Sequence, residues 1–458
     1  MKKTLAVLLA VAFLYLEPAA PLSIKSQPLA AASKFQTVAN PIPNRYIVVL
    51  ATTDLSPVAA PAPAPKAAIP VSAQTSAFST MSSDASSAMF VAAPAPDPVV
   101  VASATYLTST YGGTFSVTWS VALKGFRLNA TEQQAIAMSQ DSQVAFIVQD
   151  GAIAVGTPDG TPILMTPDPA SDLNPQPHAS WGLDRIDQRN LPLNDTYAYN
   201  NNGDGVNAYV IDTGILTTHW EFRGRASNIY DAFGGDGTPI IDCNGHGSHV
   251  AGIIGGRTFG VAKQVQLFGV RVLDCQGAGS WSNVIDGVNF VTWHHNQSAQ
   301  QGIPAVANMS LGGGTNRAAE AAVRNSIRAG ITYVVAAGNG NTDAASYSPA
   351  AVAEAITVGA TDRTDTRAEF SNYGSTLDLF APGVSITSAW IGDDFMIATA
   401  TGTSMASPHV AGVVALYLQN HRSASPAVVR SALVGNSTVG VISNPGQESP
   451  NRLLFSNY

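Results

Sequence analysis

Three short segments carry an aspartate, a histidine and a serine in settings that suit nucleophilic catalysis. Asp212 closes the apolar run NAYVID, His246 lies in the glycine-flanked string NGHGSHVAG, and Ser404 stands in GTSMASPHVAG ahead of an apolar segment. A serine hydroxyl is a poor nucleophile until a base removes its proton, and an imidazole base needs a carboxylate that fixes its tautomer. We therefore expect Asp212, His246 and Ser404 to form a catalytic triad.

The pattern of apolar and polar residues from residue 181 onward indicates the elements that must position these residues. Short, wholly apolar runs end in Gly, Asp, Asn or Ser, and helix-like segments such as SNVIDGVNFVTWHH separate them. This alternation predicts an α/β fold with a mostly parallel sheet covered by helices on both faces. Sites in such sheets lie beyond the carboxyl ends of the strands, where Asp212 stands. We expect His246 and Ser404 each to open a helix, with Pro408 in the first turn of the second helix.

Composition excludes several other classes of protein. The chain has 458 residues, of which 45% are hydrophobic and 12% are charged, with a formal net charge of −8. An acidic chain with few charges does not suit binding to nucleic acid, and it is neither a coiled coil nor a disordered chain. Two cysteines allow at most one internal disulfide.

The N-terminus predicts a secreted protein. Lys2 and Lys3 precede an apolar run and then small residues, which is typical of a signal peptide over residues 1–20; Ala20 and Ala32 are both acceptable as its end. The apolar run is too short to span a bilayer. No cysteine directly follows it to which a lipid could be attached, so we expect no membrane anchor.

The strings around Asp212, His246 and Ser404 resemble those of subtilisin-like serine endopeptidases, in particular the branch of proteinase K and aqualysin. The resemblance implies a peptidase domain over residues 179–458 that hydrolyses polypeptides through an acyl-enzyme, as a monomer without a catalytic cofactor. Residues 44–155, through NRYIVVL, LKGFRLN and VAFIVQD, resemble the small α+β inhibitory propeptide of the same family.

Two low-complexity stretches interrupt these domains. An insert rich in Ala, Pro and Ser, without helical period, covers about residues 56–103, and a linker rich in Pro, Asp and Gly covers residues 156–178. Such segments favour exposed chain where proteolysis occurs. The resemblance implies that the protein processes itself with its own active site, and we expect a mature start between about Thr157 and His178. Between the stretches, we expect two strands around an amphipathic helix capped by Thr131.

Further site residues follow from the resemblance. Asn339 would donate its side-chain amide to the tetrahedral oxyanion, together with the Ser404 backbone N–H. An extended substrate would lie between two strands, and the small lining residues imply broad specificity with a preference for apolar or aromatic P1 residues. Trp281 is either a wall of an outer subsite or plain packing. The expected lining residues are Ser310, Leu311, Gly312, Gly313, Gly277, Ala278, Gly279, Ala337 and Gly338.

The resemblance also implies a disulfide and structural calcium. Cys243 and Cys275 match the first disulfide bridge of aqualysin-like enzymes, and two cysteines in a secreted protein usually form a disulfide. Asp378 matches the carboxylate of the proteinase K calcium site. An aqualysin-type calcium loop, with the oxygen ligands that suit this ion, is matched by Asp184, Asp187, Gln188, Asn194 and Thr196. Three further aspartates could form another metal site, although we do not predict one there: Asp231, Asp236 and Asp242.

Two other functions remain open. A catalytically silent protein would hold peptides in the same cleft, and a fluorophosphonate label on Ser404 would distinguish it from an active peptidase. A zinc hydrolase would use His246 and His249, which are three residues apart on a helix, although no third ligand or adjoining Glu motif accompanies them.

Overall fold

The structure, a computed structural model, describes residues 34–51, 94–234 and 240–458. The predicted signal peptide, most of the predicted insert and Asp236 lie outside these residues. Within the described ranges, no helix combines the length and the apolar character needed to cross a membrane.

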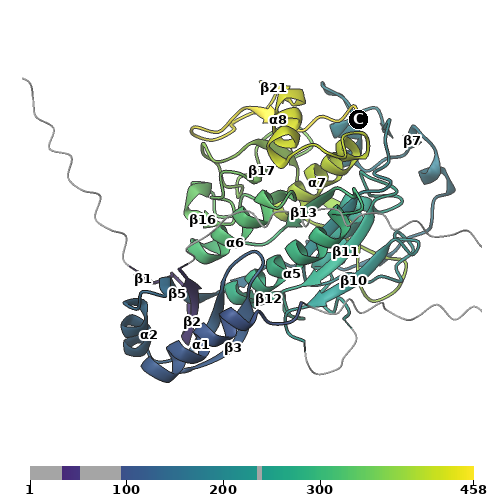
Figure 1. The fold of residues 1–458 in the computed structure, drawn as a ribbon. Helices are drawn as coiled ribbons and strands as arrows, with labels where there is room; N and C mark the ends of the chain where they lie inside the picture. The colour runs from purple at the N-terminus through teal and green to yellow at the C-terminus, as the bar shows by residue number, and fades with distance from the viewer. Residues whose placement is uncertain (1–33, 52–93, 235–239) are drawn as a thin grey trace, which may run out of the picture. The chain divides into compact units, whose positions relative to one another are not determined.

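The N-terminal part is a small sheet with two helices packed on it (Figure 1). The strand order is β1-β5-β2-β4-β3, and the pairs are antiparallel apart from β1 and β5. Alternate residues of β2 serve two cores: Val48 packs with the helices, and Ile47 packs with the strands and helices of the following domain. The elements are β1 (Phe35–Gln36), β2 (Pro41–Leu50), α1 (Pro98–Tyr111), β3 (Thr114–Trp119), β4 (Gly125–Asn129), α2 (Glu132–Ser139) and β5 (Val144–Ala154).

The prediction of an insert without helix up to residue 103 is wrong at its C-terminal end. Helix α1 begins at Pro98, where the Asp97 side chain accepts the N–H of Val99 and proline stands in the first turn. The expected cap of α2 is confirmed, because Thr131 and Gln134 form a reciprocal capping box.

In the described part of the chain, the central sheet has nine strands in the order β10-β11-β9-β13-β15-β17-β18-β22-β21. Neighbours are parallel apart from the last pair, which confirms the predicted fold class. The strands are β9 (Asn207–Asp212), β10 (Ala226–Asp231), β11 (Gln266–Arg271), β13 (Ala305–Met309), β15 (Thr332–Ala336), β17 (Ile356–Thr361), β18 (Leu379–Pro382), β21 (Thr438–Val439) and β22 (Arg452–Leu453).

Helices cover both faces of this sheet (Figure 1). Helices α5 (Trp281–Ala299) and α6 (Arg317–Arg328) share one core, and α4 (His246–Gly255), α7 (Thr403–Asn420) and α8 (Pro426–Asn436) share the other. Val210 of β9 packs in the core of α4 and α7, whereas Tyr209 and Ile211 pack in the core of α5. Because successive side chains of a strand point to opposite faces, a strand covered on both sides must be apolar throughout.

Short elements complete the described chain. Two pairings matter for the site, because β12 pairs with β5 of the predicted propeptide and β20 pairs with β6 from the predicted linker. The linker expected to be exposed, uncapped chain is therefore partly ordered on the domain. The short elements are β6 (Ile163–Leu164), η1 (Pro169–Asp172), β7 (Gln176–Pro177), α3 (Trp181–Ile186), β8 (Thr196–Tyr197), β12 (Ala278–Ser280), β14 (Gly313–Gly314), η2 (Ala344–Ser346), β16 (Tyr347–Ser348), β19 (Ile386–Ala389) and β20 (Met396–Ala400).

Candidate active site

Asp212 and His246 form a buried, hydrogen-bonded pair. Asp212 has no exposed surface, and its carboxylate accepts the backbone N–H of Thr213 at 2.8 Å. The Nδ1 atom of His246 lies 2.8 and 2.9 Å from the two carboxylate oxygens. Burial disfavours a charged imidazole, but the Asp212 carboxylate, with a smaller effect from Asp242, holds the pKa of His246 above its ordinary value. A carboxylate at Nδ1 favours the tautomer that leaves Nε2 free to act as a base.

The turn before His246 is held by Asp242, a residue to which the sequence assigned no role. Its carboxylate accepts hydrogen bonds from the first turn of α4 and, at 2.9 Å, from the hydroxyl of Thr213, which ties the start of α4 to the end of β9. An acidic residue shortly before a helix start is a capping signal, and this signal was available in the sequence. In the first turn of α4 and just before it, the donors to Asp242 are Asn244 N (3.0 Å), Gly245 N (2.8 Å), Ser248 N (2.9 Å) and Ser248 Oγ (2.7 Å).

Ser404 lies in the first turn of α7, as expected. The helix begins at Thr403, so Pro408 lies in the second turn, and its predicted place in the first turn is wrong. A residue at position 408 would normally donate its N–H to the carbonyl of Ser404. Proline has no N–H, and the hydroxyl of Ser310 donates to that carbonyl instead, at 2.7 Å.

The hydroxyl of Ser404 donates to the carbonyl of Ser310 at 3.0 Å. The two serines therefore exchange hydrogen bonds, which fixes the start of α7 against the predicted floor of the cleft. The contact between Ser404 and His246 that the chemistry requires stays a prediction.

Asn339 lies beside the turn that carries Ser404. Its Oδ1 accepts the N–H of Thr403 at 2.9 Å and the hydroxyl of Thr403 at 2.8 Å, which fixes the orientation of the amide. The amide nitrogen faces Gly402, since a Cβ atom at Gly402 would lie 3.3 Å from it. Gly338, with φ of +100°, donates its N–H to the Thr403 hydroxyl at 3.1 Å. This geometry suits the predicted role of Asn339 as an oxyanion donor.

One side of the predicted cleft, residues 277–279, is occupied by β5, the last strand of the predicted propeptide. Strand β5 pairs antiparallel with β12, so that Ile153 lies opposite Gly279. One residue beyond the strand, Val155 donates its N–H to the carbonyl of Gly277 at 3.0 Å. An extended segment thus lies where an extended substrate was predicted, and it is bound through its backbone.

Gly313 packs closely against the side chain of Ile153 in β5. A Cβ atom at Gly313 would lie 3.2 Å from the side chain of Ile153 and 3.4 Å from that of Trp281. Trp281 is 2% exposed and shares a core with Ile153, so it is packed; its role as the wall of a subsite stays a prediction. Leu311 and Ala337, two of the predicted lining residues, are buried.

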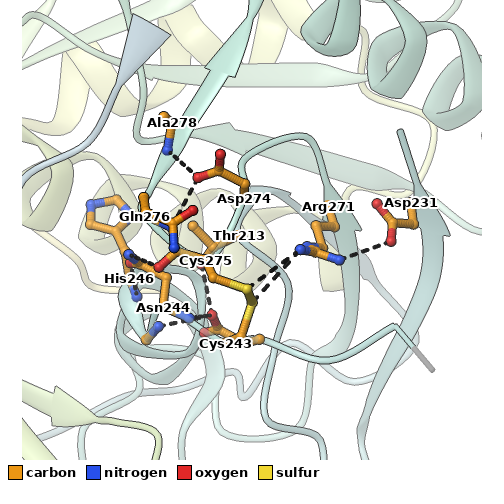
Figure 2. The surroundings of a disulfide bond; sticks show 12 residues. Thr213, Asp231, Cys243, Asn244, His246, Arg271, Asp274, Cys275, Gln276 and Ala278 are labelled. Carbon is orange, nitrogen blue, oxygen red and sulfur yellow. Dashed lines mark hydrogen bonds and ion pairs between the residues drawn. A yellow bond between two sulfur atoms is a disulfide. The ribbon is translucent and has the colours of Figure 1, made fainter. Parts of the chain in front are cut away.

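The predicted bridge between Cys243 and Cys275 is present (Figure 2). It joins the turn before His246 to the turn before β12, and the Asn244 amide donates to the Cys275 carbonyl at 3.2 Å. Figure 2 shows the Arg271 guanidinium reaching both sulfur atoms, at 3.7 and 3.8 Å. The bridge therefore links the predicted catalytic base to a strand of the cleft.

His249 is a packed helix residue. Its Nε2 lies 3.1 Å from the carbonyl oxygens of Ile386 and Ala398, and burial lowers its pKa to about 3. Among the described side chains of His, Cys, Asp and Glu, no group of three or more is placed to hold a metal ion. The zinc alternative therefore has no ligand set around His246.

Asp184 and Asp187 lie under a loop that folds back over them. Asp184 accepts the N–H groups of Asn194 and Asp195 at 3.1 and 2.7 Å, and Asp187 accepts that of Ala198 at 2.7 Å. The other oxygen of Asp187 is buried without a hydrogen-bond partner in the described structure. Burial, reinforced by the Asp184 charge, raises the pKa of Asp187 to about 6. A cation would satisfy this oxygen, so the acidic residues present fit the predicted calcium ion.

The remaining polar side chains of that loop are hydrogen-bonded to it. The Gln188 amide donates to the carbonyls of Asn190 and Pro192 at 2.5 and 2.8 Å. The Thr196 hydroxyl donates to the side chain of Asn194 at 2.5 Å. Their role as ligands stays a prediction.

Asp378 has a different environment from the one expected. Its carboxylate accepts the guanidinium of Arg430 at 2.7 Å and the N–H of Thr357 at 2.9 Å. Burial raises the pKa of Asp378, and Arg430 opposes that shift. Because Arg430 already balances its charge, the structure speaks against a calcium site at Asp378.

Comparisons with known proteins show the family of the chain. Residues 203–453 match the model of the Subtilase family. An extracellular serine proteinase from Thermus sp. (strain Rt41A) is 51% identical over 338 residues, which cover 74% of this chain and 77% of that protein. Proteinase R from Parengyodontium album is 45% identical over 62% of this chain and 71% of its own length.

A solved structure adds to these matches. The crystal structure of a cold adapted subtilisin-like serine proteinase aligns with a TM-score of 0.58 and 49% identity, over 61% of this chain and 99% of that one. These findings confirm the resemblance and the fold class that the sequence predicted.

Replacing Asn339 tests its role as an oxyanion donor. We expect Asn339→Ala to lower kcat by roughly 10²–10³ with little change in KM, because the amide serves the developing charge rather than the ground-state carbonyl. Steady-state kinetics on a chromogenic peptide measures both constants. Thr403→Ser, which keeps both donors to Asn339, is the control and should retain activity. A raised KM at unchanged kcat would show that Asn339 only helps substrate to bind.

Removing the disulfide should destabilise the fold. The bridge spans 32 residues, and closing a loop of that size stabilises by roughly 3–4 kcal/mol in the chain-entropy model, less any strain. Denaturant unfolding of Cys243→Ser/Cys275→Ser, made together with Ser404→Ala to prevent autolysis, measures the loss against Ser404→Ala alone. Equal free energies of unfolding would contradict the expectation.

Proposed function

Because the chain belongs to the subtilase family of serine peptidases, we propose that it is a secreted endopeptidase acting through an acyl-enzyme on Ser404. The observation that carries this proposal is the buried pair of Asp212 and His246. His246 takes the proton of Ser404 and returns it to the leaving amine, while Asp212 orients the ring and stabilises the imidazolium. The Asn339 amide and the Ser404 N–H bind the oxyanion.

Polypeptides bind in extended form between β12 and Gly313. Backbone pairing of this kind reads few side chains, which supports broad specificity. The burial of Ile153 against Trp281 supports an apolar preference at that subsite. The small residues of the lining support large apolar or aromatic P1 residues.

The propeptide acts as an intramolecular inhibitor, because its contacts fill the cleft and extend beyond it. Asp150 is buried and accepts the N–H and hydroxyl of Ser282 at 3.0 and 2.6 Å. Asn289 of α5 accepts the N–H groups of Val121 and Ala122 at 2.8 and 3.1 Å. These bonds lie outside the cleft, so the propeptide binds more tightly than a simple substrate strand.

Self-processing is supported by the course of the chain after β5. Val155 is bonded to the cleft strand at Gly277, and the N–H of Asp159 donates to the Thr399 carbonyl at 2.8 Å. Thr399 lies five residues before Ser404 (404 − 399 = 5). We infer that the short segment between Val155 and Asp159 runs near Ser404 and that the first cleavage falls within it.

Ser404→Ala should abolish hydrolysis and leave the propeptide attached, because the same hydroxyl performs both reactions. Mass measurement and N-terminal sequencing of the secreted protein, with host proteases inhibited, check this result. Wild-type protein should carry a fluorophosphonate label on Ser404. If purified Ser404→Ala still separates from its propeptide, self-processing is wrong; an unlabelled wild type would favour a silent peptide-binding protein.

Calcium should stabilise the fold without taking part in the chemistry. An ion bound by the native state alone stabilises by about 2.7 kcal/mol at a hundredfold excess over Kd. Chelation should leave the initial rate nearly intact and shorten the half-life on heating. Asp187→Asn should copy that loss and make added calcium less protective, whereas the exposed Asp204→Asn should not. A thermal half-life that does not respond to calcium in metal-stripped protein would contradict the site.

A further inference from the structure

The chain that follows the propeptide does not leave the surface of the peptidase domain. Besides the bond from Asp159 to the Thr399 carbonyl, the Thr401 hydroxyl donates to the Asp159 carboxylate. Strand β6 then pairs antiparallel with β20. Immediately after it, the N–H of Met165 donates to the Phe395 carbonyl at 2.8 Å. The backbone of the segment is thus held on the domain at Asp159 and again at residues 163–165.

The pairing of β6 completes the edge of a small sheet. The strand order is β19-β20-β6, so β20 would present unpaired backbone groups without β6. Both apolar side chains of β6 are largely exposed, Ile163 at 62% and Leu164 at 65%. Backbone pairing rather than side-chain burial therefore holds this part of the segment.

Asp172, at the C-terminal end of the same segment, binds two arginines through both of its carboxylate oxygens. Its carboxylate oxygens accept Nε and Nη2 of Arg257 at 2.7 and 2.5 Å. The guanidinium of Arg223 lies 3.4 and 3.3 Å from the same two oxygens. Arg257, with a smaller contribution from Arg223, holds the pKa of Asp172 below its ordinary value. A planar guanidinium that binds both oxygens is the geometry with which proteins recognise carboxylates.

The two arginines belong to a pocket of about 370 Å³. Arg257 is 8% exposed at its side chain and lies over the Trp220 ring at 4.0 Å, so its guanidinium is held in place. Arg225 and Lys263 also line the pocket, and of the described residues that line it Asp172 is the one carboxylate. The pocket is therefore a built site for a carboxylate, and the chain supplies that group itself.

We propose that the edge of β20 and the pocket of Arg257 and Arg223 form one binding track for residues 157–172 of this chain. This inference rests on the proposed self-processing: after the first cleavage the segment stays on the track as an N-terminal tail. The tail is favoured over any free acidic peptide because its covalent attachment gives it a high effective concentration.

A retained tail has a consequence for activity. The track begins at Thr399 and Thr401, just before Ser404, and therefore covers the side of the cleft that receives residues after the cleaved bond. The tail-bearing form cleaves small substrates that extend only to the N-terminal side, but it is inhibited toward longer polypeptides. Full activity requires a second cleavage, for which Leu173, 57% exposed, lies just beyond Asp172.

The test follows maturation of the full chain over time. Mass measurement and N-terminal sequencing separate a tail-bearing form, starting between residues 156 and 159, from a tail-free form. Each is assayed with a chromogenic peptide bearing a small leaving group and with a quenched peptide that extends well beyond the cleaved bond. We expect KM for the longer peptide to be at least about tenfold higher in the tail-bearing form, as for an intramolecular competitor, and equal constants for the chromogenic peptide.

Asp172→Asn and Arg257→Gln should bring that KM close to the tail-free value. Asp168→Asn is the matched control: it removes the same charge from the same segment, and asparagine keeps the cap that Asp168 makes to the Ala170 N–H. Equal KM values for the tail-bearing and tail-free forms, or equal effects of Asp172→Asn and Asp168→Asn, would overturn the track. So would a first product that already lacks the tail. If Ser404→Ala is still processed, self-processing fails, yet the comparison of the two forms still tests the track.

Discussion

The buried hydrogen bond between Asp212 and His246 is the interaction on which the rest of the site depends. A carboxylate with no exposed surface is costly unless its oxygens are bonded, and here Thr213 and His246 supply the donors. The sheet brings the carboxylate to a strand end, and Asp242 fixes the helix start that carries the imidazole. Successive residues of a helix point about 100° apart, so a shift of one residue at either end would separate the pair.

Ser404, the predicted nucleophile, is held by a second exchange of hydrogen bonds. Pro408 removes one bond from α7, and Ser310 replaces it from the turn after β13. Asn339, after β15, binds Thr403 on the other side of the same turn. Residues that follow two neighbouring strands of the central sheet thus position the start of one helix. The orientation of Ser404 therefore depends on the packing of the sheet.

The predicted propeptide and the proposed tail are bound to the remainder of the chain through their backbones. Strand β5 adds to β12, and β6 adds to β20. Side chains fix the ends: Asp150 bonds Ser282 at one, and Asp172 bonds Arg257 at the other. In the proposed function the chain acts as a substrate analogue of its own site, held additionally by the carboxylates of Asp150 and Asp172.

The sequence by itself determined the α/β class, the strand end of Asp212, the helix starts of His246 and Ser404, and the pairing of the two cysteines. Apolar periodicity, residue type and short motifs are local, and they are legible without a fold. The tertiary structure alone decided that Arg430 pairs with the Asp378 carboxylate and that the Ser310 hydroxyl replaces the hydrogen bond that Pro408 cannot make. It also decided that Asp159 bonds Thr401, which is 242 residues away in the sequence. The physical reason is that hydrogen bonds and ion pairs act over a few ångströms in space, and no local pattern records which distant residue the fold brings within that range.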